Sequence, residues 1–162
     1  MRVLRAFTLA AAAVSTVGAI VVACSDNNST GIPAGLEVYT ATLNGANEAP
    51  TPVTTTATGH AVVTVMGDSV VSWEVIIDSP IDSIIASHIH RRAADSTAGN
   101  VQVNFAPPAT GVGFTGTATI GSSAPAGALD SIFAIMRDGR SYVNVHTKKY
   151  PGGEIRGTLV KQ

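Results

Sequence analysis

The sequence predicts a mainly β fold, an antiparallel β-sandwich or flattened Greek-key barrel of about eight strands with one short helix. Short runs rich in Val, Thr and Ile recur through residues 37–160, and turn residues such as Asn-Gly separate them. One segment near residues 129–138 instead has apolar residues at helical spacing. Chains with this pattern bury alternate side chains between two facing layers or inside one closed sheet.

The expected strands follow one another closely along the chain. Gly-Asp-Ser joins the second and third strands as a hairpin, and Tyr-Pro-Gly-Gly links the last two. A helix over residues 129–138 is predicted because four apolar residues from Leu129 to Met136 fall at i, i+3, i+4 and i+7. A further strand is the alternative there. The eight expected strands cover residues 37–43, 57–66, 70–78, 84–90, 100–105, 114–120, 141–147 and 154–160.

An apolar stretch near the N-terminus ends at the one cysteine of the chain. Two arginines precede the apolar residues 6–23, and Cys24 follows Val-Val-Ala. This order is typical of an export signal with a processing site. The residues around the cysteine resemble a bacterial lipobox, in which the thiol of Cys24 is lipidated. A retained membrane helix is the alternative, because the stretch approaches the length needed to span a bilayer.

We therefore expect an exported lipoprotein of the bacterial cell envelope. Its parts are a signal peptide over residues 1–23, a flexible tether over residues 24–35 that begins with the lipidated cysteine, and a folded domain over residues 36–162. The lipid anchor holds the protein on a membrane while the rest stays in water. An outer-membrane or cell-surface location is expected if the organism has an outer membrane.

The charge and the motifs of the sequence argue against a nucleic-acid partner and against several common kinds of active site. Lys and Arg number 10 and Asp and Glu 11, and removal of the signal peptide takes away two arginines, which leaves 8 against 11 and a net charge of −3. We expect no nucleic-acid partner, because no basic surplus remains. The sequence contains no catalytic Ser-His-Asp pattern, phosphate-binding glycine loop or zinc-type cysteine pair. A non-enzymatic role is favoured, with catalysis left open.

Three histidines are candidate metal ligands. Residues two apart in a strand share one face, so His88 and His90 project together while Ile85 faces the other way. His146 lies on the outward face of the strand over 141–147. If these two strands are neighbours, three imidazoles converge on an outer face, which suits copper or zinc. Surface histidines that only hydrogen-bond their neighbours are the alternative. His60 is either a fourth ligand or an exposed strand residue.

Other polar residues near the expected site have structural or partner-binding roles. The outward face that carries the third histidine also carries Tyr142 and Asn144, while the valines between them point into the core. Glu154 and Arg156 lie two apart on the last strand and pair with each other or with a neighbouring strand. The dipeptide Arg91-Arg92 either solvates a loop, which is favoured, or binds an anion.

Five motifs together resemble one known family. They are Thr-Leu-Asn-Gly-Ala-Asn-Glu-Ala-Pro at 42–50, Ala-Thr-Gly at 57–59, Ala-Ser-His-Ile-His at 86–90, Tyr-Val-Asn-Val-His-Thr at 142–147 and Pro-Gly-Gly-Glu-Ile-Arg-Gly at 151–157. In this order they resemble the chordin-type (CHRD) domain over residues 37–160. The resemblance implies an extracellular or envelope-facing module that binds a protein or polysaccharide partner. The chain departs from the family at Arg91-Arg92, where Gly and Pro are usual.

A more distant resemblance concerns the histidines. His88, His90, His146 and Arg156 are similar in order and type to the copper histidines and the late arginine of copper–zinc superoxide dismutases, which are also β-barrel sandwiches. A bridging histidine, the zinc ligands and the disulfide are missing from this sequence. The resemblance therefore implies a copper site suited to metal handling or slow redox chemistry, and does not imply dismutase activity.

Overall fold

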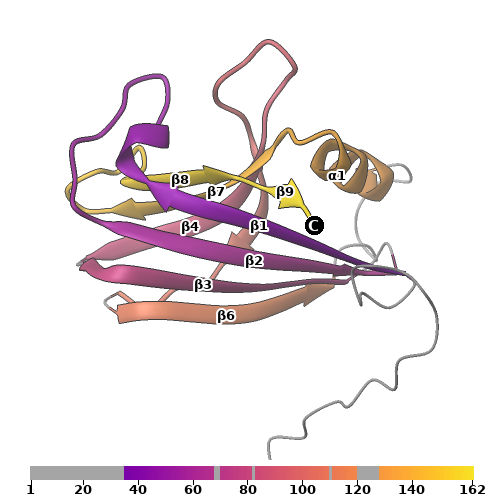
Figure 1. Ribbon diagram of the computed structural model, residues 1–162, viewed down its shortest axis with the longest axis horizontal. Helices are drawn as coiled ribbons and strands as arrows, with labels where there is room; N and C mark the ends of the chain where they lie inside the picture. Colours follow the sequence, from indigo (N-terminus) through magenta and orange to yellow (C-terminus); the bar gives the residue numbers. More distant parts are fainter. Residues whose placement is uncertain (1–34, 68–69, 82, 110, 120–127) are drawn as a thin grey trace, which may run out of the picture. The chain divides into compact units, whose positions relative to one another are not determined.

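Nine strands join in one antiparallel sheet within the residues that the computed structural model describes, which are 35–67, 70–81, 83–109, 111–119 and 128–162 (Figure 1). A 3-10 turn, η1 (Gly45–Asn47), and a helix, α1 (Ala128–Arg137), accompany the sheet. The strands are β1 (Leu36–Asn44), β2 (Thr58–Met66), β3 (Val70–Ile81), β4 (Ile84–Arg91), β5 (Val101–Phe105), β6 (Gly111–Thr119), β7 (Ser141–Thr147), β8 (Ile155–Thr158) and β9 (Val160–Lys161).

The predicted fold class is confirmed, and the strand and helix boundaries agree with the sequence prediction within a few residues. One difference concerns the last predicted strand, over residues 154–160. It is divided into β8, which pairs with β7 and β1, and β9, which pairs with β1. Leu159 lies between the two short strands and is fully buried, so the chain turns its side chain into the core at this point.

The predicted signal peptide, Cys24 and nearly all of the tether lie outside the described residues. Contacts divide the chain into residues 1–31 and residues 32–162, and the second unit contains the whole sheet. Within the described part of the chain, no helix is both long enough and apolar enough to cross a membrane.

The sheet curls so that its two ends approach each other. Its strand order is β5-β4-β7-β8-β1-β2-β3-β6, which places β5 and β6 at opposite ends. Phe105 of β5 nevertheless stacks on Trp73 of β3, with ring centroids 4.4 Å apart, and meets Phe114 of β6 edge-on at 6.2 Å. These rings close the core of a flattened barrel, and the inward valines and isoleucines of alternating strands fill the remainder.

Helix α1 buries three residues of the apolar stripe predicted from the sequence, and the side chain of the fourth, Leu129, lies outside the described part. Phe133 and Met136 are almost fully buried, and Ile132 joins them in the core. The helix packs near β4 and β9 and ends at Arg137. Two residues later comes Gly139, whose positive φ of 67° suits a residue without a side chain. This ending turns the chain into β7, which carries part of the candidate site.

The structure corrects the expected environment of β7. Its residues opposite the core were expected on an open outer face, yet Tyr142 and Asn144 are buried. Two long connections fold over this face, the segment around η1 and the loop of residues 92–100 (Figure 1). Alternation along the strand assigns the correct side of the sheet, but it carries no information about loops that cover that side.

A second correction concerns the start of β4. Ile85 was expected on the core side with Ile89, but 51% of Ile85 is exposed, while Ile84 is 5% exposed and Ile89 is fully buried. The pairing of β4 with β7 shifts register between Ile84 and Ala86. Such an irregularity exchanges the faces of the residues before it, so simple alternation fails there.

Candidate metal centre

The fold brings the three predicted histidines together. Strands β4 and β7 are neighbours, and their register pairs Ala86 with His146 and His88 with Asn144. One ring nitrogen from each of His88, His90 and His146 lies within 4.8 Å of the others. The shortest separation, 3.3 Å, joins His88 Nδ1 and His146 Nε2. The cluster therefore sits on the side of the sheet away from the core, in reach of the covering loops.

Backbone carbonyls fix the ring orientation of two of these histidines. His90 Nδ1 lies 3.0 Å from the Gly99 carbonyl oxygen, and His146 Nδ1 lies 2.9 Å from the Pro151 carbonyl oxygen. A carbonyl can only accept, so each Nδ1 carries the hydrogen and each neutral ring keeps its lone pair on Nε2. His90 Nε2 is buried and has no hydrogen-bond partner among the described residues. The His90 lone pair is thus available to a donor or a cation, while the His146 lone pair faces His88 Nδ1 at 3.3 Å.

The third histidine is neutral at physiological pH. Burial, and then the neighbouring imidazoles of His146 and His90, lower the pKa of His88 to about 4. Burial also lowers the pKa of His90. A metal ion binds imidazole in its neutral form and must otherwise displace a proton. His88 therefore meets this requirement near pH 7 without losing a proton, and burial acts in the same sense on His90.

A stack of planar groups supports His90 from behind. The Tyr142 ring is parallel to the His90 ring, with centroids 4.9 Å apart and an angle of 2° between planes. The Arg156 guanidinium lies 3.5 Å from the Tyr142 ring centroid on a cation–π contact. The Tyr142 hydroxyl accepts a hydrogen bond of 3.2 Å from the Gly99 N–H. The N–H and the carbonyl oxygen of Gly99 are therefore both hydrogen-bonded, and these bonds fix the loop that orients His90.

A buried carboxyl beneath this stack was missed by sequence reasoning. Glu48 directly follows η1, is only 5% exposed, and its Oε2 accepts a 3.3 Å hydrogen bond from Asn144 Nδ2. Burial raises the pKa of Glu48 to about 7, although the charge of Arg156 and the hydrogen bond from Asn144 act in the opposite direction. Loops have no periodicity, and nothing in the pattern of η1 and the residues after it indicated that this side chain turns inward.

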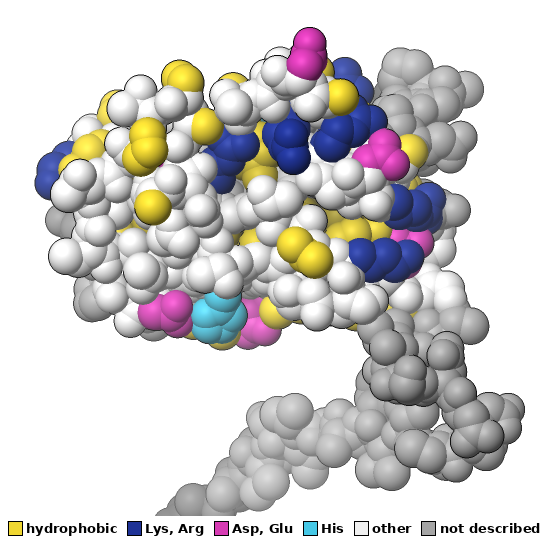
Figure 2. Space-filling view, turned by 45° about the horizontal axis from the view of Figure 1, so that its top comes forward, with side chains coloured by type: hydrophobic (Ala, Val, Ile, Leu, Met, Phe, Trp, Pro, Cys, Tyr) yellow, Lys and Arg dark blue, Asp and Glu magenta, His cyan; other side chains and the backbone are white. Residues whose placement is uncertain are grey.

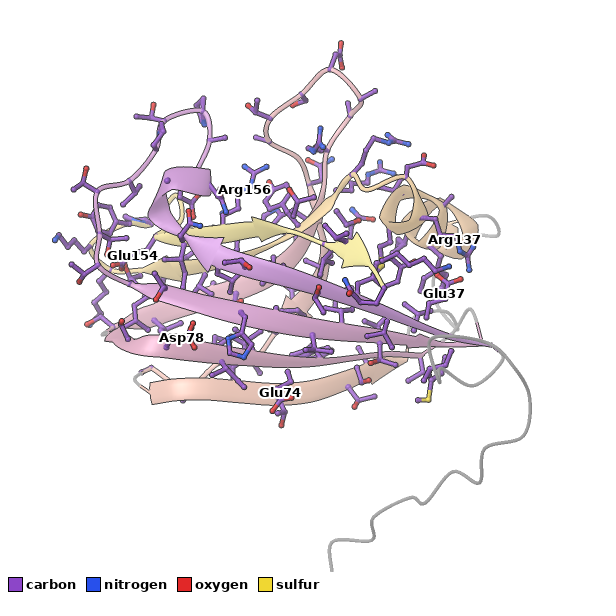
Figure 3. All side chains as sticks on the ribbon, in the orientation of Figure 1. Glu37, Glu74, Asp78, Arg137, Glu154 and Arg156 are labelled. Atoms are coloured by element: carbon purple, nitrogen blue, oxygen red, sulfur yellow. The ribbon has the colours of Figure 1, made fainter. Side chains whose placement is uncertain are left out.

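The remaining predicted residues have separate places. Glu154 is buried and accepts hydrogen bonds of 2.7 Å from the hydroxyls of Thr55 and Thr147, so it holds a turn together and does not pair with Arg156 (Figure 3). His60 lies on β2 outside the histidine cluster. Its Nδ1 is 3.2 Å from the carboxylate of Asp78, and both side chains are 48% exposed. The sequence alternative of an exposed strand residue describes His60 correctly.

The donor set fits a transition metal ion. Zinc–imidazole bonds are about 2.0–2.1 Å long, which puts two donors of a tetrahedral site about 3.4 Å apart. The 3.3 Å between His88 Nδ1 and His146 Nε2 agrees with that spacing, and the three ring nitrogens lie within 4.8 Å of one another. Two donors on one ion are at most about 4.2 Å apart, so the rings would draw slightly closer on binding. Three protein ligands leave a further coordination position for water or a substrate, and His88 and His146 are only partly buried. Carbonyl oxygens behind the ligands supply the usual outer support.

Comparison with known proteins identifies one family. The family model described as the CHRD domain matches residues 39–159. This range runs from within β1 to the end of β8 and includes the three histidines and both covering loops. No curated protein and no solved structure matched the chain.

Proposed function

The chain belongs to the CHRD domain family, and we propose that it binds copper or zinc through His88, His90 and His146. One observation carries this proposal. Ring nitrogens of three histidines from two neighbouring strands converge within 4.8 Å, and backbone carbonyls orient His90 and His146 so that each turns Nε2 away from its carbonyl partner. A cluster that only hydrogen-bonded internally would pair its buried nitrogens, whereas His90 Nε2 has no partner among the described residues.

The protein's own residues would orient and shield the ion. His90 and His146 present Nε2 because Gly99 and Pro151 hold the opposite nitrogens. The buried ring of Tyr142 keeps His90 from rotating by packing flat against it. Bound zinc supplies a Lewis acid, and bound copper supplies one-electron chemistry. The supported role is metal handling or slow redox chemistry, and catalysis stays open.

The proposed setting is the bacterial cell envelope. Its support is the sequence alone, in which an apolar stretch ends at a lipobox-like cysteine, Cys24, followed by a polar tether. A lipid anchor there would keep the metal site in the water phase near a membrane. A protein or polysaccharide partner, expected from the family resemblance, stays a prediction.

Calorimetric titration of the full chain in detergent with copper and zinc tests the metal proposal. We expect one equivalent to bind with sub-micromolar affinity. At a hundredfold excess over the dissociation constant, the ion should raise the free energy of unfolding by roughly 3 kcal/mol. The double variant His88→Ala/His90→Ala should lose both effects. His60→Ala is the matched control, because it removes an exposed histidine outside the cluster and should leave binding intact.

Two further controls keep this experiment decisive. Circular dichroism verifies that the variants fold, and His88→Gln offers a milder change at a partly buried position. Equal metal affinity and equal stabilisation by metal in the wild type and in a folded double variant would contradict the metal proposal. Loss of binding in His60→Ala would place the site elsewhere on the chain.

A further inference from the structure

A pocket of about 340 Å³ lies at the end of β4, outside the histidine cluster. Arg91, Arg92 and Arg140 line it, together with Gly99 and Ile135, and no acidic side chain is among its described lining residues. Its walls come from three places in the sequence, which are the end of β4, the 92–100 loop and the turn between α1 and β7. In the upper part of Figure 2, several Lys and Arg side chains, coloured dark blue, lie close together.

Backbone hydrogen bonds fix the positions of these arginines. Arg92 donates its N–H to the Arg140 carbonyl at 3.0 Å, and Arg91 donates its N–H to the Asn100 carbonyl at 2.9 Å. Gly99 allows the loop to close over them, because a Cβ at Gly99 would stand 1.4 Å from the Arg91 carbonyl oxygen. The three cationic residues are therefore held together by the fold.

The positive charge of this pocket is poorly compensated inside the protein. Arg91 has no hydrogen-bond or ion-pair partner for its guanidinium among the described residues. Arg140 pairs with the exposed Asp138 at 2.9 Å, and the Arg92 guanidinium reaches the Gly139 carbonyl oxygen only at 3.4 Å. By contrast, Arg137 on α1 lies 2.9 Å from Glu37, away from the pocket lining (Figure 3).

The repulsion extends to a fourth guanidinium. Burial lowers the pKa of Arg156, Tyr142 and Glu48 act in the opposite direction, and the nearby charge of Arg92 lowers it further by a smaller amount. The whole chain has a formal net charge of −1, so this cluster is a local concentration of positive charge on a slightly acidic protein. Partly buried like charges held at fixed positions favour a bound counter-ion.

We propose that this arginine pocket binds a phosphate- or sulfate-type oxyanion carried on a larger molecule. A guanidinium presents its N–H groups in a planar fork that matches two oxygens of such a group. Three arginines line this pocket, and its volume of 340 Å³ exceeds that of a single oxyanion, which leaves room for the carrier. The apolar side chain of Ile135 would contact that carrier. The site needs no metal and is separate from the histidine cluster.

Titrations of the metal-free full chain with inorganic phosphate, inorganic sulfate, glucose 6-phosphate and glucose 6-sulfate test this site. We expect saturable binding of one equivalent of a glucose ester, tighter than that of the inorganic ion of the same type. The comparison of the two esters distinguishes phosphate from sulfate as the preferred group. Raising the ionic strength from about 20 to 200 mM should weaken binding, because exposed charges are screened over roughly 10 Å.

Variants separate a built site from general attraction. Arg91→Gln should weaken ester binding roughly tenfold, because a hydrogen bond to a charged group is lost. Arg91→Lys keeps the positive charge but lacks the planar guanidinium. Its affinity for the ester should lie between those of the wild type and Arg91→Gln. Arg137→Gln removes an equal charge outside the pocket lining and should change affinity less than twofold. His88→Gln should not weaken ester binding, which makes failure here distinguishable from failure of the metal proposal.

Two outcomes would overturn the proposal. One is the absence of saturable binding for all four probes at low ionic strength. The other is equal weakening by Arg91→Gln and Arg137→Gln in variants whose thermal unfolding matches the wild type.

Discussion

Replacing the buried Glu48 with glutamine tests how this carboxyl, which contacts Asn144, affects the stability of the fold. Burial holds the pKa of this carboxyl at about 7 against an ordinary 4.5, and Glu48 Oε1 has no hydrogen-bond partner among the described residues. A raised pKa means that the folded protein keeps the proton more tightly than the unfolded chain. The carboxyl therefore has no effect on the free energy of unfolding below pH 4.5, where it is protonated in both states. As pH rises from 4.5 through about 7, the free energy of unfolding falls.

The size of the effect follows from the two pKa values. Their difference, at 1.36 kcal/mol for each pKa unit, corresponds to about 3 kcal/mol above pH 7. Glutamine keeps an acceptor for Asn144 and stays neutral. The difference in free energy of unfolding between Glu48→Gln and wild type should thus rise by about 3 kcal/mol from pH 4.5 to pH 8.

Urea denaturation at several pH values measures this difference. Trp73, the one tryptophan of the sequence, is in the core and reports unfolding by fluorescence. Glu74→Gln removes an exposed carboxyl on β3 and controls for the loss of a negative charge (Figure 3). Parallel stability curves for Glu48→Gln and wild type would refute the reasoning. A shift of equal size in Glu74→Gln would attribute it to net charge.

Three further predictions concern the core, the loop and the surface. Phe105→Ala removes the ring stacked on Trp73 and should lower the free energy of unfolding by roughly 3–5 kcal/mol, measured by urea denaturation, whereas a loss below 1 kcal/mol would contradict closure of the barrel there. Gly99→Ala forces the loop off its close backbone contact and should weaken zinc binding at least tenfold by calorimetry; unchanged affinity would show that the loop does not orient the ligands. Asp78→Asn breaks the exposed pair with His60 and should change the unfolding free energy by less than about 1 kcal/mol, so a larger change in a thermal scan would count against its surface character.

The sequence predicted the strands well because their local pattern is strong. Alternation in β4 and β7 correctly placed His88 and His90 on one face and His146 on the matching face of another strand. Their convergence depended on an added condition, that the two strands are neighbours. Strand β5, strand β6 and helix α1 intervene between them in the chain, and no local pattern specifies such a non-sequential pairing.

The loops and the register irregularity were beyond sequence reasoning. Glu48 and Gly99 lie in connections without periodicity, so their positions against β7 depend on tertiary contacts alone. Ile85 was placed on the wrong face because a shift in pairing at the start of β4 cannot be read from alternation. The same loops cover a face that was expected to be open, and burial lowers the pKa of His88 and His90 there.

X-ray absorption of the full chain loaded with one equivalent of zinc tests the metal centre most directly. We predict three imidazole nitrogens at about 2.0 Å from the ion and one further oxygen or nitrogen ligand. Replacing His88, His90 and His146 together should abolish this spectrum, while His60→Ala should preserve it. A shell dominated by oxygen, or an imidazole signal that survives the triple replacement, would contradict the account.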